Sequence, residues 1–565
     1  MKKIFLLSLF AFAFLFSSCE LLDLLLEGQP SGSTYKYEEK EINIPVQDCG
    51  PDDTLYLVKL NNSDGIIEDK QTGGINPGDI SYRSAENFFY SDSDSFIRQL
   101  NANMQLDATL YVSRAASSSS SIVSGYSSKS YTEGKEYEFW SYTETIGENK
   151  YVSNQVSANC IYEGDYCYVF ADTSDSKKTD KGISLSNEDY INLGKKFDSC
   201  YQLEIGVLGN PFYKKYHETY FVPCNQKIVI LVSDLFGDAS LNQDSGTVGY
   251  FYNGDLFNQT YMNQIYGQGK YHSNECEIFY IDSLFLTKRK ETVYSTLVHE
   301  FNHMINYVVK TVNGLTENPK ATSFNSCDQW FTEMLSMVTE DLFQDFLKLD
   351  DKDSPKARLP YFNMYYNYGY RLWDRQDIPA LVMYANTYAF GAYLVRNFGG
   401  IELLQKIAQN QYVNEEAITQ ALRTCNPKYY YTDDISGAEK RIDYEYAMRK
   451  FSMCLFNTDA PSQEQLQRKG ENQYFSFYRG AGNKGDSLHF NPIDIMSIKC
   501  DLQKEDGTIR KNQIIKPVIY EADDIIGLGP SGFSVHKIGQ NVSSFKLMAS
   551  NKEGLEYYLI TVTRD

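Results

Sequence analysis

Positive charge is scarce in this sequence. The 565 residues include 53 Lys and Arg against 74 Asp and Glu, which gives a formal net charge of -21. A protein that binds nucleic acid needs a basic surface to neutralise phosphates, so nucleic acid is not an expected partner. The same acidity disfavours electrostatic binding to an anionic lipid surface. The composition is typical of an acidic exported protein.

Long apolar segments and Cys-rich metal motifs are also missing. The apolar run near the N-terminus, Ile4 to Phe16, has about 13 residues, which is too short to cross a bilayer comfortably. The 11 cysteines include no C-x-x-C pair, which argues against a Cys-rich zinc site. Trp is rare, with 3 residues, whereas 46 Tyr and 33 Phe favour half-buried β structure.

The N-terminus has the order of a secretory signal. Met1-Lys2-Lys3 is basic, the apolar run follows, and Ser17-Ser18 precedes Cys19. Small residues directly before a Cys resemble the lipobox of bacterial lipoproteins. That resemblance implies a signal peptide over 1–18, lipidation at Cys19 and a tether over 19–35. The expected location is the bacterial cell envelope or surface, with a membrane anchor through Cys19; an ordinary signal peptide with an incidental Cys is the alternative.

The cysteines beyond Cys19 are even in number. An exported chain meets an oxidising or thiol-poor compartment, so up to five disulfides are permitted, but the sequence does not give their pairing.

Three regions follow the tether. Residues 36–150 alternate in polarity as strands do and are expected to form an N-terminal β-rich domain. Residues 151–450 combine unbroken apolar strands with long helical segments, and the β pattern returns over 451–565. The predicted fold class is α+β multidomain, in which a central domain with an α/β first part and a helical second part is flanked by β-sandwich-like domains.

The segment 292–310 carries the strongest chemical signal. It has no Pro or Gly and shows helical apolar spacing. His299 and His303 lie four residues apart, so both can reach one metal from the same side of a helix. Glu300 is offset by about 100° and can lie beside a metal-bound water as general base. Two ordinary core or surface histidines are the alternative.

A catalytic zinc needs a third protein ligand and one open position. The segment 329–343 is again helical, and it carries Glu333 thirty residues after His303. Glu333 is the predicted third ligand of a single Zn²⁺, and Glu340 is either an outer acid that supports a ligand or a solvated helix residue. No third His follows at the H-E-x-x-H-x-x-G-x-x-H spacing. Four other histidines lack metal-ligand spacing: His217, His272, His489 and His536.

YSTLVHEFNHMIN followed by WFTEMLSMVTE resembles the hyicolysin-type metallopeptidase family, a branch of the gluzincins. The resemblance covers roughly residues 150–410 and implies a thermolysin-like catalytic domain. Met334 departs from the pattern, because such proteins often have Gly after the ligand Glu, and it could narrow the site. The resemblance also points to Tyr388 in NTYAFGAYLVRNFGG as an oxyanion donor, although packing is the ordinary role of a Tyr in a Tyr-rich chain.

These features predict a zinc-dependent endopeptidase of extracellular proteins or peptides, with a zinc-bound water activated by Glu300. One alternative is a surface binding lipoprotein with a non-catalytic metal site. Another is a hydrolase of peptidoglycan peptides. Acidic clusters such as Asp92 and Asp94 could hold a structural Ca²⁺, but no such site can be assigned, and the oligomeric state stays open.

Overall fold

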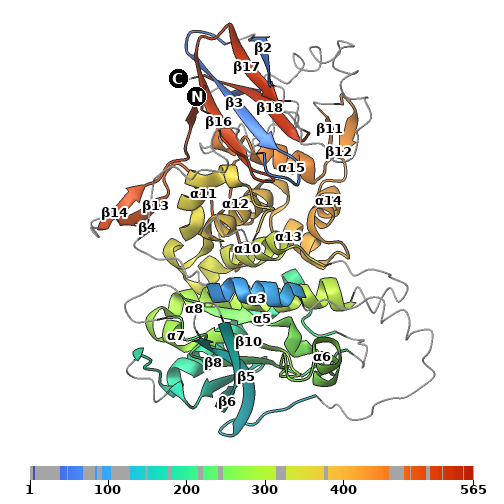
Figure 1. Cartoon of the computed structure of the whole chain (residues 1–565), viewed down its shortest axis with the longest axis vertical. Helices are drawn as coiled ribbons and strands as arrows, with labels where there is room; N and C mark the ends of the chain where they lie inside the picture. The colour runs from blue at the N-terminus through green and yellow to red at the C-terminus, as the bar shows by residue number, and fades with distance from the viewer. Residues whose placement is uncertain are drawn as a thin grey trace, which may run out of the picture.

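The computed structural model describes the greater part of the chain. The described residues are 4–6, 39–46, 49–67, 83–84, 92–103, 128–146, 150–175, 181–213, 220–239, 246–313, 326–373, 380–433, 436–456, 476–483, 485–503, 509–524, 526–550 and 553–563. They form a mixed α+β structure, as expected for the fold class. In Figure 1 a lower sheet with its helices, a central layer of helices and an upper sheet follow one another along the long axis.

The lower sheet has six strands in the order β5-β6-β7-β8-β10-β9. The strands are β5 (Glu136–Ile146), β6 (Lys150–Glu163), β7 (Cys167–Asp172), β8 (Ile228–Ser233), β9 (Gly249–Phe251) and β10 (Ile278–Asp282). Strands β7, β8 and β10 are mutually parallel, and β9 runs antiparallel to β10 at the edge. Every residue of β8 and β10 is buried, which explains why both strands are continuous apolar runs.

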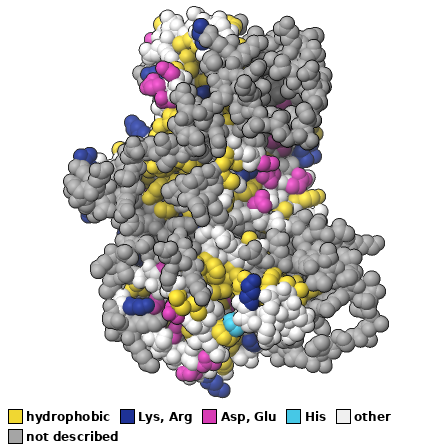
Figure 2. Space-filling model, viewed as in Figure 1, with side chains coloured by type: hydrophobic (Ala, Val, Ile, Leu, Met, Phe, Trp, Pro, Cys, Tyr) yellow, Lys and Arg dark blue, Asp and Glu magenta, His cyan; other side chains and the backbone are white. Residues whose placement is uncertain are grey.

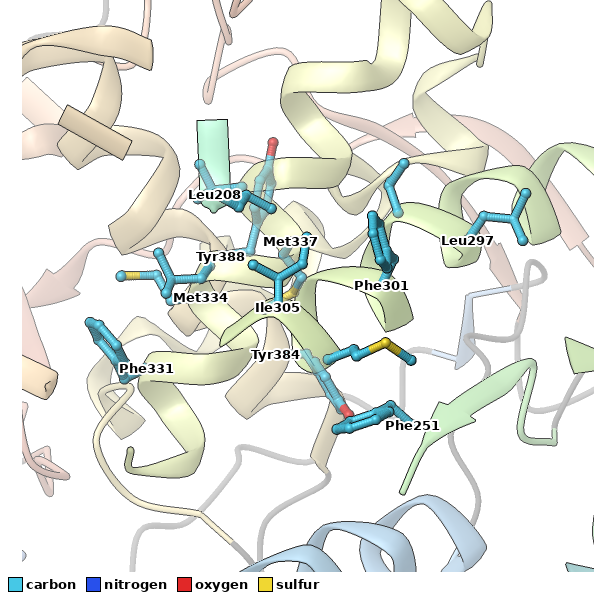
Figure 3. Packing of buried hydrophobic residues seen from close by; sticks show 14 of the residues in the cluster. Leu208, Phe251, Leu297, Phe301, Ile305, Phe331, Met334, Met337, Tyr384 and Tyr388 are labelled. Atoms are coloured by element: carbon cyan, nitrogen blue, oxygen red, sulfur yellow. The ribbon is translucent and has the colours of Figure 1, made fainter. Parts of the chain in front are cut away.

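Two long helices lie beside this sheet, and a third packs on the second of them. They are α5 (Asn187–Leu208), α8 (Lys290–Asn306) with its π-helical continuation (Tyr307–Val312), and α10 (Gln329–Leu347). Phe197 of α5 packs edge-on against Phe301 of α8, with ring centroids 5.0 Å apart. In Figure 3, Phe301 and Ile305 of α8 pack towards Met337 of α10, so α8 is held in the core between its neighbours.

The helical layer continues beyond α10. Helix α12 (Ala380–Phe398) packs on α10. The other helices are α3 (Asp92–Asn103), α6 (Gln259–Tyr266), α7 (Ser283–Lys288), α11 (Leu359–Tyr365), α13 (Gly400–Gln409), α14 (Asn414–Cys425) and α15 (Tyr444–Phe451). Short 3-10 turns span Asn253–Leu256, Asp351–Asp353, Pro355–Arg358, Tyr366–Tyr368 and Cys454–Phe456. Helix α3 comes from the N-terminal region but lies against the lower half of the molecule (Figure 1).

The upper sheet joins strands from both ends of the chain. Its order is β1-β18-β3-β16-β15, and separate pairs or ribbons are formed by β17-β2, β14-β13-β4 and β11-β12. The strands are β1 (Ile4–Leu6), β2 (Glu39–Pro45), β3 (Asp53–Asn61), β4 (Arg83–Ser84), β11 (Tyr430–Thr432), β12 (Glu439–Arg441), β13 (Lys499–Gln503), β14 (Ile509–Ile514), β15 (Tyr520–Glu521), β16 (Phe533–Gln540), β17 (Ser544–Ser550) and β18 (Leu555–Thr563).

This topology differs from two flanking β domains bounded at 36–150 and 451–565. Strand β3 pairs with both β16 and β18, so the N-terminal and C-terminal β regions share one sheet. Strand β5, which also falls within 36–150, belongs instead to the lower sheet. Alternating polarity identifies a strand but not its partner, because any strand with one apolar face satisfies the same pattern.

Further expectations concern the envelope and the surface. Cys19 lies outside the described residues, and of 1–18 only Ile4–Leu6 is described, as edge strand β1. The ten described cysteines are all free thiols. No helix within the described ranges is both long and apolar enough to cross a membrane. On the face drawn in Figure 2, the described Lys and Arg side chains are scattered rather than gathered into one basic patch.

Candidate metal centre

Helix α8 presents two imidazoles to one point. The buried stripe that includes Val293, Leu297 and Phe301 fixes the rotation of this helix against the core. His299 and His303 lie one turn apart, and their Nε2 atoms are 3.0 Å from each other. The structure therefore brings the two predicted histidine ligands together.

Helix α10 supplies a carboxylate to the same point. Glu333 Oε2 lies 3.3 Å from His299 Nε2 and 3.7 Å from His303 Nε2. Around a tetrahedral zinc with bonds of 2.0 to 2.1 Å, ligand atoms stand about 3.3 Å apart. The observed spacing matches that value, and two imidazoles with one carboxylate are a donor set that zinc uses. Within the described residues this is the one His, Cys, Asp and Glu group compact enough to hold an ion.

The three side chains are also coupled electrostatically. Burial alone would raise the pKa of Glu333, but the charge of His303 and the contact with His299 outweigh it and lower the pKa below its usual range. Burial alone would lower the pKa of His299, whereas its contacts with Glu333 and Glu340 raise the pKa well above its usual value. The pocket therefore favours positive charge at the point where the three donors meet.

Glu340 lies directly behind the first imidazole. Its Oε1 is 2.7 Å from His299 Nδ1, and Ser295 donates a hydrogen bond of 2.6 Å to its Oε2. A carboxylate at Nδ1 holds the proton on that nitrogen and leaves Nε2 free to bind a metal. Glu340 is therefore a buried acid in contact with His299 rather than a solvated helix residue.

The second imidazole is backed by hydroxyl and amide groups. Ser336 Oγ lies 3.4 Å from His303 Nδ1 and donates to Asn302 Oδ1 at 3.1 Å. Asn302 in turn donates to Thr339 Oγ1 at 3.1 Å. These contacts link α8 to α10 and hold the two ligand helices in register. Ser336, Asn302 and Thr339 could not be predicted from the sequence, because the spacing of such residues has no recognisable pattern.

Glu300 lies beside the three converging side chains. It is 7% exposed and follows His299 on α8. With His299 it lines two adjoining cavities, one of about 380 Å³ and one of about 80 Å³. The larger cavity also reaches His303 and Glu333. A carboxylate at this position can accept a proton from a molecule bound in the cavity that His299, His303 and Glu333 also line.

The structure does not place Tyr388 in the site. Its side chain is fully buried and lines neither cavity, and its hydroxyl lies near Asp341 and Arg396, which form an ion pair of 2.8 Å. Tyr384, one turn earlier on α12, lines both cavities. In Figure 3 the Tyr384 ring lies beside Phe251, whereas the Tyr388 hydroxyl points away. Tyr384 rather than Tyr388 therefore faces the cavities, because the helical pattern predicts the helix but not its rotation about its own axis.

Met334 does not narrow the site. It is 1% exposed, lines neither cavity and packs against α12, where a Cβ added at Gly391 would lie 2.7 Å from Met334 Cγ. The Met334 side chain, which stands where the resemblance predicts a Gly, is therefore accommodated by Gly391 on the facing helix α12.

Three of the remaining histidines have structural partners. His489 Nε2 lies 2.9 Å from Asp345 Oδ2, and His272 stacks on Trp140. His536 contacts Ser534 Oγ at 2.8 Å, and burial lowers its pKa to about 4. His217 lies outside the described residues. A structural Ca²⁺ site remains unassigned.

Comparison with known proteins supports a metallopeptidase. No protein-family model matches the chain. It is 28% identical over 291 residues to the neutral metalloprotease ShpI of Staphylococcus hyicus, an alignment that covers 49% of this chain and 56% of that protein. The chain thus matches little more than half the length of this relative. A crystal structure of an M1 zinc metallopeptidase from Deinococcus radiodurans aligns with 8% identity and a TM-score of 0.25, over 52% of this chain and 57% of the other. The narrower hyicolysin-type assignment stays a prediction.

Proposed function

We propose that this chain is a zinc-dependent endopeptidase. The observation that carries the proposal is the convergence of His299, His303 and Glu333 within coordination spacing, beside Glu300 and an accessible cavity. The similarity to a neutral metalloprotease points the same way. A purely structural zinc site would be closed by a fourth protein ligand, whereas this one faces a cavity of about 380 Å³.

His299, His303 and Glu333 would hold the ion. When bound there, zinc supplies Lewis acidity that polarises a peptide carbonyl and lowers the pKa of a water molecule. Glu300 accepts a proton at its carboxylate as water attacks the carbonyl carbon, and it then delivers that proton to the leaving amine nitrogen. Glu340 keeps His299 oriented through both steps by holding the proton on Nδ1.

Tyr384 is the candidate donor for the developing oxyanion. Its side chain lines both cavities together with His299 and Glu300. A phenol hydroxyl at such a position can donate a hydrogen bond to the carbonyl oxygen as negative charge develops on it. Tyr384 thereby takes the role that the sequence analysis gave to Tyr388.

The edge of the lower sheet favours an extended polypeptide as substrate. Val248 accepts a hydrogen bond from Asp282, and Gly249, Tyr250 and Phe251 then pair in sequence with β10. Hydrogen-bonded pairs alternate along an antiparallel ladder, so the main-chain groups of Gly249 and Phe251 point to the open edge. Both residues line the larger cavity. An unfolded peptide can therefore add as a strand beside the site.

The cellular setting is part of the same proposal. Residues 1–18 would direct export, and Cys19 would carry the lipid anchor that holds the enzyme at the bacterial envelope. The substrates would then be extracellular or envelope proteins and peptides.

The test compares the wild-type chain with Glu300→Gln on casein as an unstructured substrate. Zinc content is measured by elemental analysis. We expect the variant to retain zinc and to lose about 10²- to 10⁴-fold in kcat/KM, because general-base catalysis contributes that much. Glu291→Gln, an exposed change in the first turn of α8, is the matched control. Equal cleavage by Glu300→Gln would refute Glu300 as the base. Cleavage of peptidoglycan stem peptides without cleavage of casein would redirect the proposal to that substrate class.

A further inference from the structure

Helix α3 covers the cleft that the metal ligands face. Ile97, Arg98, Asn101 and Ala102 line the larger cavity, which His303 and Glu333 also line. Their spacing of one, three and four residues places them on one face of the helix. The same helix is visible in front of α8 in Figure 1. A segment more than 190 residues before the first ligand thus forms one wall of the candidate active site.

The first anchor of α3 is an arginine at Tyr384. Arg98 Nη1 donates a hydrogen bond of 2.7 Å to the Tyr384 hydroxyl. The guanidinium also lies 5.5 Å from the Trp373 ring centroid and 5.4 Å from that of Tyr384. Arg98 is 8% exposed. It therefore fills the space beside the phenol that the proposed reaction would present to a substrate carbonyl.

The second anchor is an amide at the open edge of the sheet. Asn101 Nδ2 donates to the Phe251 carbonyl at 2.8 Å, and Asn101 Oδ1 accepts from the Asn253 N–H at 2.9 Å. The Asn253 side chain donates in return to the Asn101 carbonyl at 3.1 Å. The Phe251 carbonyl is one of the groups that an added substrate strand would use. The Asn101 side-chain amide therefore takes the place of the main-chain N–H that an added strand would donate to the Phe251 carbonyl.

From these two anchors we propose that α3 is an autoinhibitory helix. It occupies the substrate edge and the space beside Tyr384 in the resting chain, and it leaves when an extended polypeptide binds. The inference rests on the proposed endopeptidase function. A tethered segment acts at high effective concentration, so a few contacts suffice to hold it in place. An isolated helix of 12 residues is only marginally stable in water, so α3 would also unfold readily once it leaves the cleft.

The competing explanation is that α3 is a permanent wall in which Arg98 positions Tyr384. The two explanations predict opposite effects of removing the anchors. If α3 blocks the site, the full chain with Arg98→Leu and Asn101→Leu gains activity, because peptide competes with a weaker occupant. If α3 positions Tyr384, the same chain loses activity.

The first experiment measures binding without catalysis. In a Glu300→Gln background, we compare the affinity of the double variant and of the unaltered α3 for a fluorescein-labelled casein fragment. Loss of two hydrogen-bonded anchors should tighten binding roughly tenfold or more. Gln99→Ala, an exposed change on the same helix, should leave the affinity unchanged. Equal or weaker binding by the double variant would overturn autoinhibition.

A second measurement guards against misfolding of the double variant. Amide hydrogen exchange over 95–103 is followed in the Glu300→Gln chain with unaltered α3, with and without a saturating casein fragment. Faster exchange on binding supports displacement, and equal or slower exchange refutes it. Failure of the proposed function would appear elsewhere, as absence of casein cleavage by every chain that retains Glu300.

Discussion

The carboxylate of Glu340 and the imidazole of His299 are joined by a 2.7 Å contact at Nδ1, on the side of the ring opposite the other donors. The contact links α10 to α8 at the level of the metal centre. It sets the tautomer of His299 and therefore the direction in which the ring can bind a metal.

Replacing Glu340 should weaken zinc binding without unfolding the site. We expect Glu340→Gln to lower zinc affinity by roughly 10- to 100-fold, since partners of ligating histidines contribute on that scale. Competition with a metal chelator measures the change. Glu402→Gln, on the exposed face of α13, is the control and should bind zinc as the wild type does. Unchanged affinity in Glu340→Gln would show that His299 needs no carboxylate behind it.

The two tyrosines of α12 should separate catalysis from packing. Tyr384→Phe should lower kcat by about 10²- to 10³-fold, the usual effect of losing one oxyanion donor. Tyr388→Phe should leave kcat nearly unchanged, because its hydroxyl lies beside the Asp341–Arg396 pair rather than in a cavity. Steady-state kinetics on a fluorogenic peptide compare the two. A larger loss in Tyr388→Phe would restore the role first expected for it.

Metal removal should destabilise the helical core. A ligand that binds only the folded chain adds about 2.7 kcal/mol of stability at 100 times its Kd. A chelator should therefore lower the thermal midpoint of the wild-type chain, because His299, His303 and Glu333 join α8 to α10 through the ion. Differential scanning calorimetry measures the shift. In Glu333→Ala the chelator should have little effect, and an equal shift there would place the bound metal elsewhere.

The buried Glu204 should make stability fall as pH rises. It is fully buried on α5 with no hydrogen-bond partner among the described residues, and burial raises its pKa well above the usual value. The folded chain then holds a proton that the unfolded chain releases above a pH of about 4.3, so the free energy of unfolding decreases from there upward.

Glu204→Met should remove this penalty. We expect urea denaturation to show a higher free energy of unfolding for the variant, with a larger gain at pH 7 than at pH 5. Glu188→Gln, in the exposed first turn of the same helix, controls for a change of net charge. A gain that is the same at both pH values would show that Glu204 is not protonated in the folded chain.

The candidate metal centre could be predicted from the sequence because its geometry is local. His299, Glu300 and His303 sit within two turns of one helix, so the helical period alone sets their relative directions. Predicting Glu333 required one more inference, namely that a second apolar helix carrying an acidic residue packs against the helix of the two histidines. These predictions depended only on periodicity and ligand chemistry, and the structure brings the four residues together.

What the sequence did not reveal depends on rotation and long-range pairing. Tyr384 and Tyr388 differ by one turn of α12, and only packing against α10 decides which one reaches the cavity. Asn101 and Arg98 carry no motif, so their place in the lining of the cavity follows from the tertiary fold alone. The pairing of β3 with β18 could not be predicted either, because the polarity pattern of a strand does not specify which strand it pairs with.

That pairing has a consequence for biogenesis. Val58 of β3 lies opposite Tyr558 of β18, about 500 residues further along the chain, and such distant contacts slow folding because a very long loop must close first. A chain is synthesised N-terminus first, so β3 stays without its neighbours in the sheet until the last residues have followed. The exposed edge of β3 during that interval is an aggregation hazard, and chaperones would be needed most at that stage.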